Sequence, residues 1–402
     1  MRKNYIFTAI SLAAALLLAG CAAGQPAEAQ AAESQQTEAQ AAAAQPAESQ
    51  KAEAQAAAAQ PAESRKAEAE TTEAQSAEPE TTEVQHAESQ PTEGTDGAPV
   101  VYFTSDISPE SLVEIYEKLG WTPSGKTAVK ISTGEPPASN YLRPELIGDL
   151  VKKVGGTIVE CNTAYGGSRA SSAMHKQVAE DHGFTKIADF DLMDEDGEVE
   201  WPINGGSGAD SAASQDSAGS QDKIRRLNRI IVGSHAENYS DWIILSHFKG
   251  HAMAGFGGAI KNVGIGISSP SGKVYVHTAG TKTSGSIWYD DQDAWLEALA
   301  EMVYGFSSHV GKEHIVYINV MNRLSVDCDC DGNPAEPDIH DIGILASVDP
   351  VALDQACIDL VNQAEGKESL VSRIESRHGL HTLEHAEEIG LGSRTYELVN
   401  ID

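Results

Sequence analysis

Basic residues are scarce in this sequence of 402 residues. Its 28 lysines and arginines face 60 aspartates and glutamates, so the formal net charge is −32. Proteins that bind nucleic acid neutralise its phosphates with a basic face. The composition therefore predicts no nucleic-acid partner.

Cysteine is also scarce, with five residues in the chain. Cys21 lies near the N-terminus, and four cysteines remain in the later part, an even number that permits two disulfides outside the cytoplasm. Four are too few for a small fold that depends on disulfides. They are Cys161, Cys328, Cys330 and Cys357.

Long apolar runs are limited to Tyr5–Ala19, which is too short to span a bilayer as a permanent helix and follows two basic residues, as in an export signal. The run ends in Leu18-Ala19-Gly20-Cys21, which resembles the lipobox of bacterial lipoproteins. The resemblance implies a signal peptide over residues 1–21 and an extracytoplasmic protein anchored to a lipid bilayer through lipidated Cys21. A simple secretory peptide is the alternative. The opening MRKNY has no twin arginine, so we expect export in the unfolded state.

Branched aliphatic residues are almost missing from residues 22–98, where Val84 stands among Ala, Glu, Gln, Ser, Thr and Pro. Such a segment cannot build a core, so a disordered linker is predicted. As a flexible chain it would extend about 50 Å on average. The globular part is then 99–402, with a Gly/Ser-rich surface loop at 203–222.

The globular part alternates short β-rich apolar runs with amphipathic helical patterns. This alternation predicts an α/β fold with a mostly parallel sheet flanked by helices, in one or two lobes. Strands are expected at 127–131, 157–160, 242–245, 315–320 and 342–346. Helices are expected at 109–119, 144–154, 170–181, 292–306 and 351–363.

Polar residues that follow a buried strand are favoured ligand positions in such a sheet. The segment HFKGHAMAGFGGAIKN, residues 247–262, follows one. It matches neither a phosphate-binding loop nor a zinc-protease helix, because the required glycines and glutamate are missing. We expect a glycine-rich turn that brings backbone close to a ligand, with the lysine as a cation or covalent anchor and the histidines as metal ligands or proton carriers. The residues concerned are His247, His251, Gly255, Gly257, Gly258, Lys261 and Asn262. The alternative is a sharp turn with surface histidines.

A second candidate segment is the acidic loop Asp327-Cys-Asp-Cys-Asp-Gly332. As thiolates, Cys328 and Cys330 would be soft ligands for zinc, iron or an iron–sulfur cluster, and Cys357 or Cys161 could complete the set. The same spacing of aspartates imitates a calcium-binding loop. A disulfide or a plain acidic turn is the third possibility.

Residues 251–261 and His277, which we expect to follow a further strand, are together similar to the core of the nickel-pincer lactate racemase family. By matching position, the resemblance implies that His251 carries a proton, Lys261 anchors the pincer cofactor and His277 binds nickel. The second catalytic histidine of that family has no counterpart around residues 162–165. Arg169 or His175 are the candidates for its place.

A longer resemblance covers most of residues 100–402. The segments SHFKGHAMAGFGGAIKNVGIG, VDCDCDGNPAEPDIHDIGILASVDPVALDQA and HTLEHAEEIGLGSRTYEL are similar to the bacterial domain of unknown function 362, whose members are often labelled iron–sulfur-centre proteins. The ferredoxin-like cysteine module of several members is missing here.

These patterns together predict a metal-centred site that acts on a small acid by redox chemistry or proton transfer. A non-catalytic protein that captures a metal or small ligand is the alternative. Arg143 and Arg169 could bind a substrate carboxylate, and surface ion pairs are the favoured expectation for both. Cys161 is expected as a small buried group.

Overall fold

The computed structural model describes residue 94 and residues 97–203 and 223–402. The predicted signal peptide with Cys21, nearly all of the linker, and the Gly/Ser-rich loop apart from Ile203 therefore lie outside the described residues. Within the described ranges, no helix combines the length and the apolar character needed to cross a membrane.

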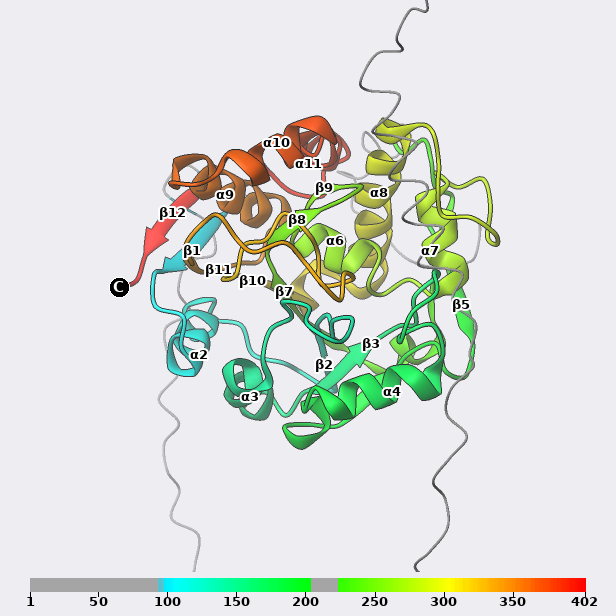
Figure 1. Ribbon diagram of the computed structural model, residues 1–402, viewed down its shortest axis with the longest axis horizontal. Helices are drawn as coiled ribbons and strands as arrows, with labels where there is room; N and C mark the ends of the chain where they lie inside the picture. The colour runs from blue at the N-terminus through cyan, green and yellow to red at the C-terminus, as the bar shows by residue number, and fades with distance from the viewer. Residues whose placement is uncertain (1–93, 95–96, 204–222) are drawn as a thin grey trace, which may run out of the picture. The chain divides into compact units, whose positions relative to one another are not determined.

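The centre of the fold is an eight-stranded sheet (Figure 1). Neighbouring strands pair in parallel, except that β11 runs antiparallel to both of its neighbours. The mostly parallel α/β sheet predicted from the sequence is thereby confirmed. In spatial order the strands are β12 (Glu397–Asn400), β1 (Val100–Thr104), β11 (Gly343–Ser347), β10 (Ile315–Met321), β7 (Asp241–His247), β2 (Thr127–Lys130), β3 (Thr157–Glu160) and β4 (Phe190–Leu192).

Helices cover both faces of this sheet, which is why its central strands β7 and β10 are buried along their whole length. Ile243 and Leu245 of β7 pack with α2 (Pro109–Lys118), α3 (Pro144–Lys153) and α4 (Ser172–Asp181). Trp242 and Ile244 face the opposite core. That core is formed with α6 (Ala259–Gly264), α7 (Pro270–His277), α8 (Gln292–Val310), α9 (Pro350–Gln363), α10 (Glu368–Ser376) and α11 (Leu380–Glu388).

Helix starts follow the capping signals in the sequence. Ser108 accepts a hydrogen bond from the Ser111 amide at the start of α2, and Asp349 accepts from the amides of Val351 and Ala352 at the start of α9. In both helices proline occupies the first turn, where its missing N–H costs nothing. The described residues belong to a single compact unit, so a second lobe is not seen among them.

One local prediction is wrong. The segment before His277 is the helix α7 and not a strand, because Ser269 caps it and Pro270 opens it. The glycine-rich turn is a small hairpin of β8 (Lys249–His251) and β9 (Gly255–Gly257), followed directly by α6. β5 (Glu198–Pro202) and β6 (Arg229–Gly233) form a separate antiparallel pair.

Candidate functional site

A pocket of about 420 Å³ lies at the carboxyl ends of β2, β3 and β7. Its other walls are the β8–β9 hairpin, α6, α7 and the loop that follows β10. The pocket brings together most of the residues singled out from the sequence: His247, His251, Gly257, Gly258, Lys261, Asn262, His277, Cys328 and Cys330. Gly255 and Cys357 do not line it.

Lys261 reaches the pocket from the middle of α6. Among the described residues, its amine has no hydrogen-bond or ion-pair partner. Burial and the nearby Lys249 ammonium lower the pKa of Lys261 to about 7. A Cβ at Gly257 would lie 3.4 Å from Lys261 Cδ and 3.5 Å from Lys249 Cε, which is ordinary van der Waals contact, so both lysine chains pass close to this glycine. A free amine of this kind serves as an anion ligand or, when neutral, as a nucleophile.

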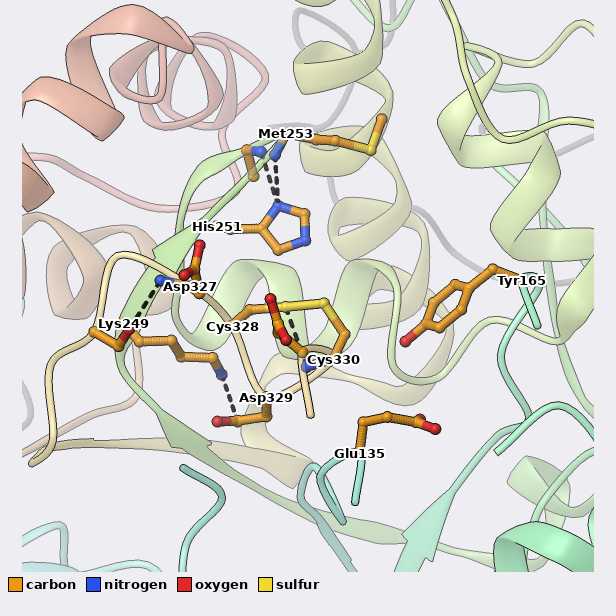
Figure 2. Close-up of a disulfide and its surroundings, with 12 residues drawn as sticks. Glu135, Tyr165, Lys249, His251, Met253, Asp327, Cys328, Asp329 and Cys330 are labelled. Atoms are coloured by element: carbon orange, nitrogen blue, oxygen red, sulfur yellow. Dashed lines mark hydrogen bonds and ion pairs between the residues drawn. A yellow bond between two sulfur atoms is a disulfide. The ribbon is translucent and has the colours of Figure 1, made fainter. Parts of the chain in front are cut away.

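His251 has only one ring nitrogen available (Figure 2). Its Nδ1 accepts hydrogen bonds from the backbone amides of Met253, at 3.2 Å, and Ala254, at 2.9 Å. Burial and the neighbouring Lys261 hold the pKa of His251 well below its usual range, so the ring is neutral and its proton lies on Nε2. His251 is therefore a hydrogen-bond donor to the pocket. The prediction of a proton carrier requires proton uptake at Nδ1, which would break both backbone bonds.

His277, the last residue of α7, stacks on Trp295 with ring centroids 5.0 Å apart. Its Nδ1 is buried and has no hydrogen-bond partner among the described residues. Burial, with Lys261 nearby, lowers the pKa of His277 to about 3. The ring is thus neutral, as a metal-binding imidazole must be, and one of its nitrogens is unsatisfied.

His247 lines the pocket but is fully engaged. Its Nδ1 lies 2.8 Å from Asp329 Oδ1 and its Nε2 lies 2.6 Å from the carbonyl oxygen of Asn322. Because both ring nitrogens face oxygen acceptors, neither offers a lone pair to a metal. Lys249 completes this group with a 3.0 Å ion pair to the other oxygen of Asp329. His247 is therefore a structural residue here and not the metal ligand that the sequence suggested.

The opposite wall carries a second group of paired charges. Lys130 Nζ lies 3.0 Å from Glu160 Oε2, and Arg169 Nε lies 3.0 Å from Glu135 Oε2. Burial opposes the charge on Glu160, yet Lys130 and the other cations around it hold its pKa at about 2. Arg169 is buried, so its predicted place in a surface ion pair is wrong. His175 is buried behind this wall, between Thr133 and Asn162, and does not line the pocket.

Cys328 and Cys330 form a disulfide in the pocket wall, beside His251 (Figure 2). Of the three possibilities that the sequence allowed for this loop, the disulfide is the one present. The two sulfurs and His251 lie close enough to hold a metal ion, with their ligand atoms within 4.8 Å of one another, but only after reduction to thiolates. Cys357 cannot complete the set, since it lies in the core with Asn319 as its hydrogen-bond partner.

The aspartates of the same loop point to different partners. Asp329 pairs with Lys249 and His247, Asp327 forms a 3.5 Å ion pair with Arg373, and Asp331 accepts a hydrogen bond from the amide of Asn333. A calcium loop needs its carboxylates to converge on one point. This arrangement does not support the calcium alternative.

Asn262 and the glycines act mainly within the fold. Asn262 accepts from Lys130 Nζ and donates to the carbonyl oxygens of Lys130 and Leu245, which ties α6 to the ends of β2 and β7. Gly258 packs against the Asp354 carboxylate, where a Cβ would clash. Gly255 adopts a positive φ of 82° in the hairpin. Of the predicted cofactor-binding residues, Lys261 is the one whose polar atom is free.

Sequence reasoning missed the positive charge of the pocket. Its lining contains five lysines and arginines but two carboxylates, Glu160 and Asp329. These cations come from strands, helices and a loop, and nothing in the local sequence separates such a residue from a surface lysine or arginine, so this excess could not be found by pattern. The five cations are Lys130, Arg169, Lys249, Lys261 and Lys273.

The pocket lies within a region of recognised family. The model of the domain of unknown function DUF362 matches residues 127–359. The chain belongs to the DUF362 family. The DUF362 match runs from β2 into α9 and includes every residue that lines the pocket.

The other comparisons are less informative about this chain. None of the curated proteins matches this DUF362 chain. Among solved structures, it is similar to the lactate racemase apoprotein from Thermoanaerobacterium thermosaccharolyticum, with 14% identity, a TM-score of 0.34, and coverage of 55% of this chain and 50% of that one. It is also similar to a structural-genomics target from Thermotoga maritima, with 11% identity, a TM-score of 0.33, and coverage of 70% and 58%. The chain thus spans 50% and 58% of the length of these two structures.

Proposed function

We propose that this DUF362 domain binds a small organic acid in its pocket and that Lys261 is the anchor. The observation that carries the proposal is the partnerless amine of Lys261 in a pocket where cations outnumber carboxylates. An anion entering such a pocket gains an ion pair without breaking an existing one. The volume of about 420 Å³ suits a small molecule.

Two imidazoles complete the proposed site. His251 offers an Nε2–H donor, which stabilises negative charge on a carboxylate or on the oxygen of a polarised carbonyl. His277 offers a neutral ring with an unsatisfied nitrogen, which suits a metal ion. The bound acid would then lie between a cation, a hydrogen-bond donor and a metal, as redox or proton-transfer chemistry beside a carbonyl requires.

A pincer-type nickel cofactor is the group that the motif resemblance implies, and two residues fit it. Lys261 has the free amine needed for an anchor, and His277 has the unsatisfied nitrogen needed for a metal ligand. When bound, such a group would supply a metal centre that stabilises developing negative charge. His251 would contribute a hydrogen bond from Nε2.

The location belongs to the proposal as well. The Leu18-Ala19-Gly20-Cys21 motif after a short apolar run supports export and lipidation at Cys21. We infer that the pocket works outside the cytoplasm at a membrane surface. Metabolic labelling with a fatty acid tests this, and labelling that persists in Cys21→Ser would contradict it.

Calorimetric titration tests the acid site directly. Pyruvate and lactate should bind the full chain, while their neutral amides bind far more weakly. Lys261→Met should abolish binding of the acids, and the matched control Lys176→Met, on the exposed helix α4, should not. Equal affinity for acids and amides, or an unchanged Lys261→Met variant, would contradict the proposal.

Two further measurements refine the role of the lysine and the metal. Borohydride added with pyruvate leaves a permanent mass increase on Lys261 if the neutral amine attacks the carbonyl carbon and water leaves to form an imine. Elemental analysis shows whether a metal accompanies the protein. Turnover of the acid, followed by NMR, distinguishes an enzyme from the alternative of a non-catalytic binding protein.

A further inference from the structure

The Cys328–Cys330 disulfide differs from the other cysteines of the described residues in its surroundings. It lines the pocket, and Cys330 is the more exposed of its two residues. Cys161 and Cys357 are buried free thiols, and burial raises the pKa of Cys161 to about 12 and that of Cys357 well above its usual range. Cys161 also lines the pocket, but it is a buried thiol, whereas Cys330 is exposed.

The disulfide adds little to the stability of the loop. It joins residues two positions apart, so the loop that it closes is among the shortest possible, and the restriction of the unfolded chain is correspondingly small. Other bonds already fix the segment: Asp329 pairs with Lys249, the Asp331 amide donates to the Cys328 carbonyl, and Ser325 Oγ donates to the Ala335 carbonyl. A purely structural role leaves its place in the pocket wall unexplained.

The neighbours of Cys328 suit a thiolate. The Cys330 amide nitrogen lies 3.2 Å from Cys328 Sγ, as a donor. A ring nitrogen of His251 lies within 4.8 Å of both sulfurs. Its Nε2 carries a proton because Nδ1 accepts two backbone bonds. The amines of Lys249 and Lys261 line the same pocket. Donors and cations around a sulfur favour its anionic form.

We propose that Cys328 and Cys330 are a reversible dithiol–disulfide couple, and that the partner is a small thiol that carries a carboxylate. The thiolate of the partner attacks Sγ of the more exposed Cys330, the S–S bond breaks, and Cys328 leaves as a thiolate held by the Cys330 amide and by His251 Nε2–H. A second partner thiolate then attacks the sulfur of the first partner in the mixed disulfide, the two partners form a disulfide, and Cys330 leaves as a thiolate. Two thiols are oxidised to one disulfide, and the protein gains two electrons and two protons.

A metal site built from the same three residues is less consistent with the hydrogen bonding. For Nε2 of His251 to bind a metal, its proton would have to move to Nδ1, which already accepts from two backbone amides. In the couple, by contrast, His251 keeps the tautomer that those amides impose. The couple does not depend on acid binding at Lys261, so the two proposals fail independently.

Redox titration of the full chain tests the couple. The protein is equilibrated with glutathione buffers of varied thiol-to-disulfide ratio, quenched with an alkylating reagent and mapped by mass spectrometry. We expect Cys328 and Cys330 to become labelled together while the protein stays folded and Cys161 and Cys357 stay unlabelled. A disulfide that resists every ratio until the protein is unfolded would overturn the proposal, as would purified protein with both thiols bound to a stoichiometric metal.

Two further experiments test the choice of partner thiol and the role of His251 separately. Thioglycolate, an anionic thiol, should reduce the disulfide about tenfold or more faster than neutral 2-mercaptoethanol, after normalisation to a small-molecule disulfide. His251→Leu should lower the alkylation rate of reduced Cys328 at pH 7 roughly tenfold, because a hydrogen bond to the thiolate is lost. His251→Gln keeps a donor and should retain most of the rate. Equal rates for the two thiols overturn the choice of partner, and equal rates for the folded wild type and both variants overturn the role of His251.

Discussion

The polar residues around the pocket form two sets, which differ in whether their side chains already have a hydrogen-bond or ion-pair partner. Lys130, Lys249 and Arg169 are each paired with a carboxylate at about hydrogen-bond distance, and they join elements far apart in the sequence. Lys261 and His277 lie in the same pocket with an amine and a ring nitrogen that lack partners among the described residues. The lysines and the arginine contribute positive charge to the pocket, and His277 contributes a polar ring nitrogen. The difference indicates that the paired set holds the pocket in shape, while the unpaired set is available to a ligand.

Removal of a paired carboxylate should have the largest effect. Glu160→Gln leaves the buried Lys130 and Arg169 with less compensation, so we expect a loss of about 3 to 5 kcal/mol in the free energy of unfolding, measured with urea. The control is Glu117→Gln, which breaks an exposed pair with Lys153 and should cost less than about 1 kcal/mol. Similar losses in both variants would remove the distinction between buried and exposed pairs.

Strong acid should weaken the paired set, because it protonates the carboxylates. The pKa of Glu160 is lowered from 4.5 to about 2, so its contribution is fully present above pH 4.5 and is lost as the pH falls through 2. A shift of this size corresponds to about 3 kcal/mol. Urea unfolding at several pH values should show this loss in the wild type and a weaker one in Glu160→Gln. A profile that is identical in both proteins would assign the acid sensitivity to other groups.

The two histidines allow a matched comparison. His247→Phe removes hydrogen bonds to Asp329 and to the Asn322 carbonyl, and should cost about 2 kcal/mol or more. His277→Phe keeps the stacking on Trp295 and loses no hydrogen bond at Nδ1, so the change should stay within about 1 kcal/mol. Thermal unfolding measures both. The reverse order would mean that His277 is part of the scaffold.

Lys261→Met should have the smallest effect on stability. The variant removes a poorly compensated cation and keeps an apolar chain of similar length, so the free energy of unfolding should change by about 1 kcal/mol or less, or rise. The substitution should instead remove a reactive amine from the pocket. The amine of wild-type Lys261 should react with acetic anhydride increasingly as the pH rises through 7, since it becomes neutral there. A large loss of stability in Lys261→Met would place this residue in the paired set.

The sequence predicts the parts of the fold that depend on local patterns. The strand at 157–160 and the helices that begin at Pro109 and Pro144 are recovered because burial period and capping are encoded within a few residues. The segment before His277 is misread because Val-Tyr-Val is typical of strands, and the cap at Ser269 decides for a helix. His247, His251 and Lys261 follow a strand end or glycines and line one pocket, as expected. His277 lines it too, although it ends a helix and does not follow a strand.

Contacts between residues that are far apart in the sequence could not be predicted from local patterns. Lys130 is buried because Glu160, thirty positions away, lies on the neighbouring strand β3. His385 of α11 is buried against Glu301 of α8, 84 positions away. Neither partner lies within the range of a local motif. For the same reason the tautomer of His251, which depends on amides two and three residues ahead in the folded hairpin, was not foreseen.

The helix that carries Lys261 is hydrogen-bonded to a helix outside the pocket wall. Helix α6 has six residues, and Asp354 of α9 accepts hydrogen bonds from the amides of Ala259 and Ile260 at its start, at 2.8 and 3.0 Å. No residue of α9 lines the pocket. A small displacement of α9 would therefore carry the amine of Lys261 with it. Substitutions in that rear helix are a route by which affinity can drift during evolution while every residue that a ligand touches stays the same.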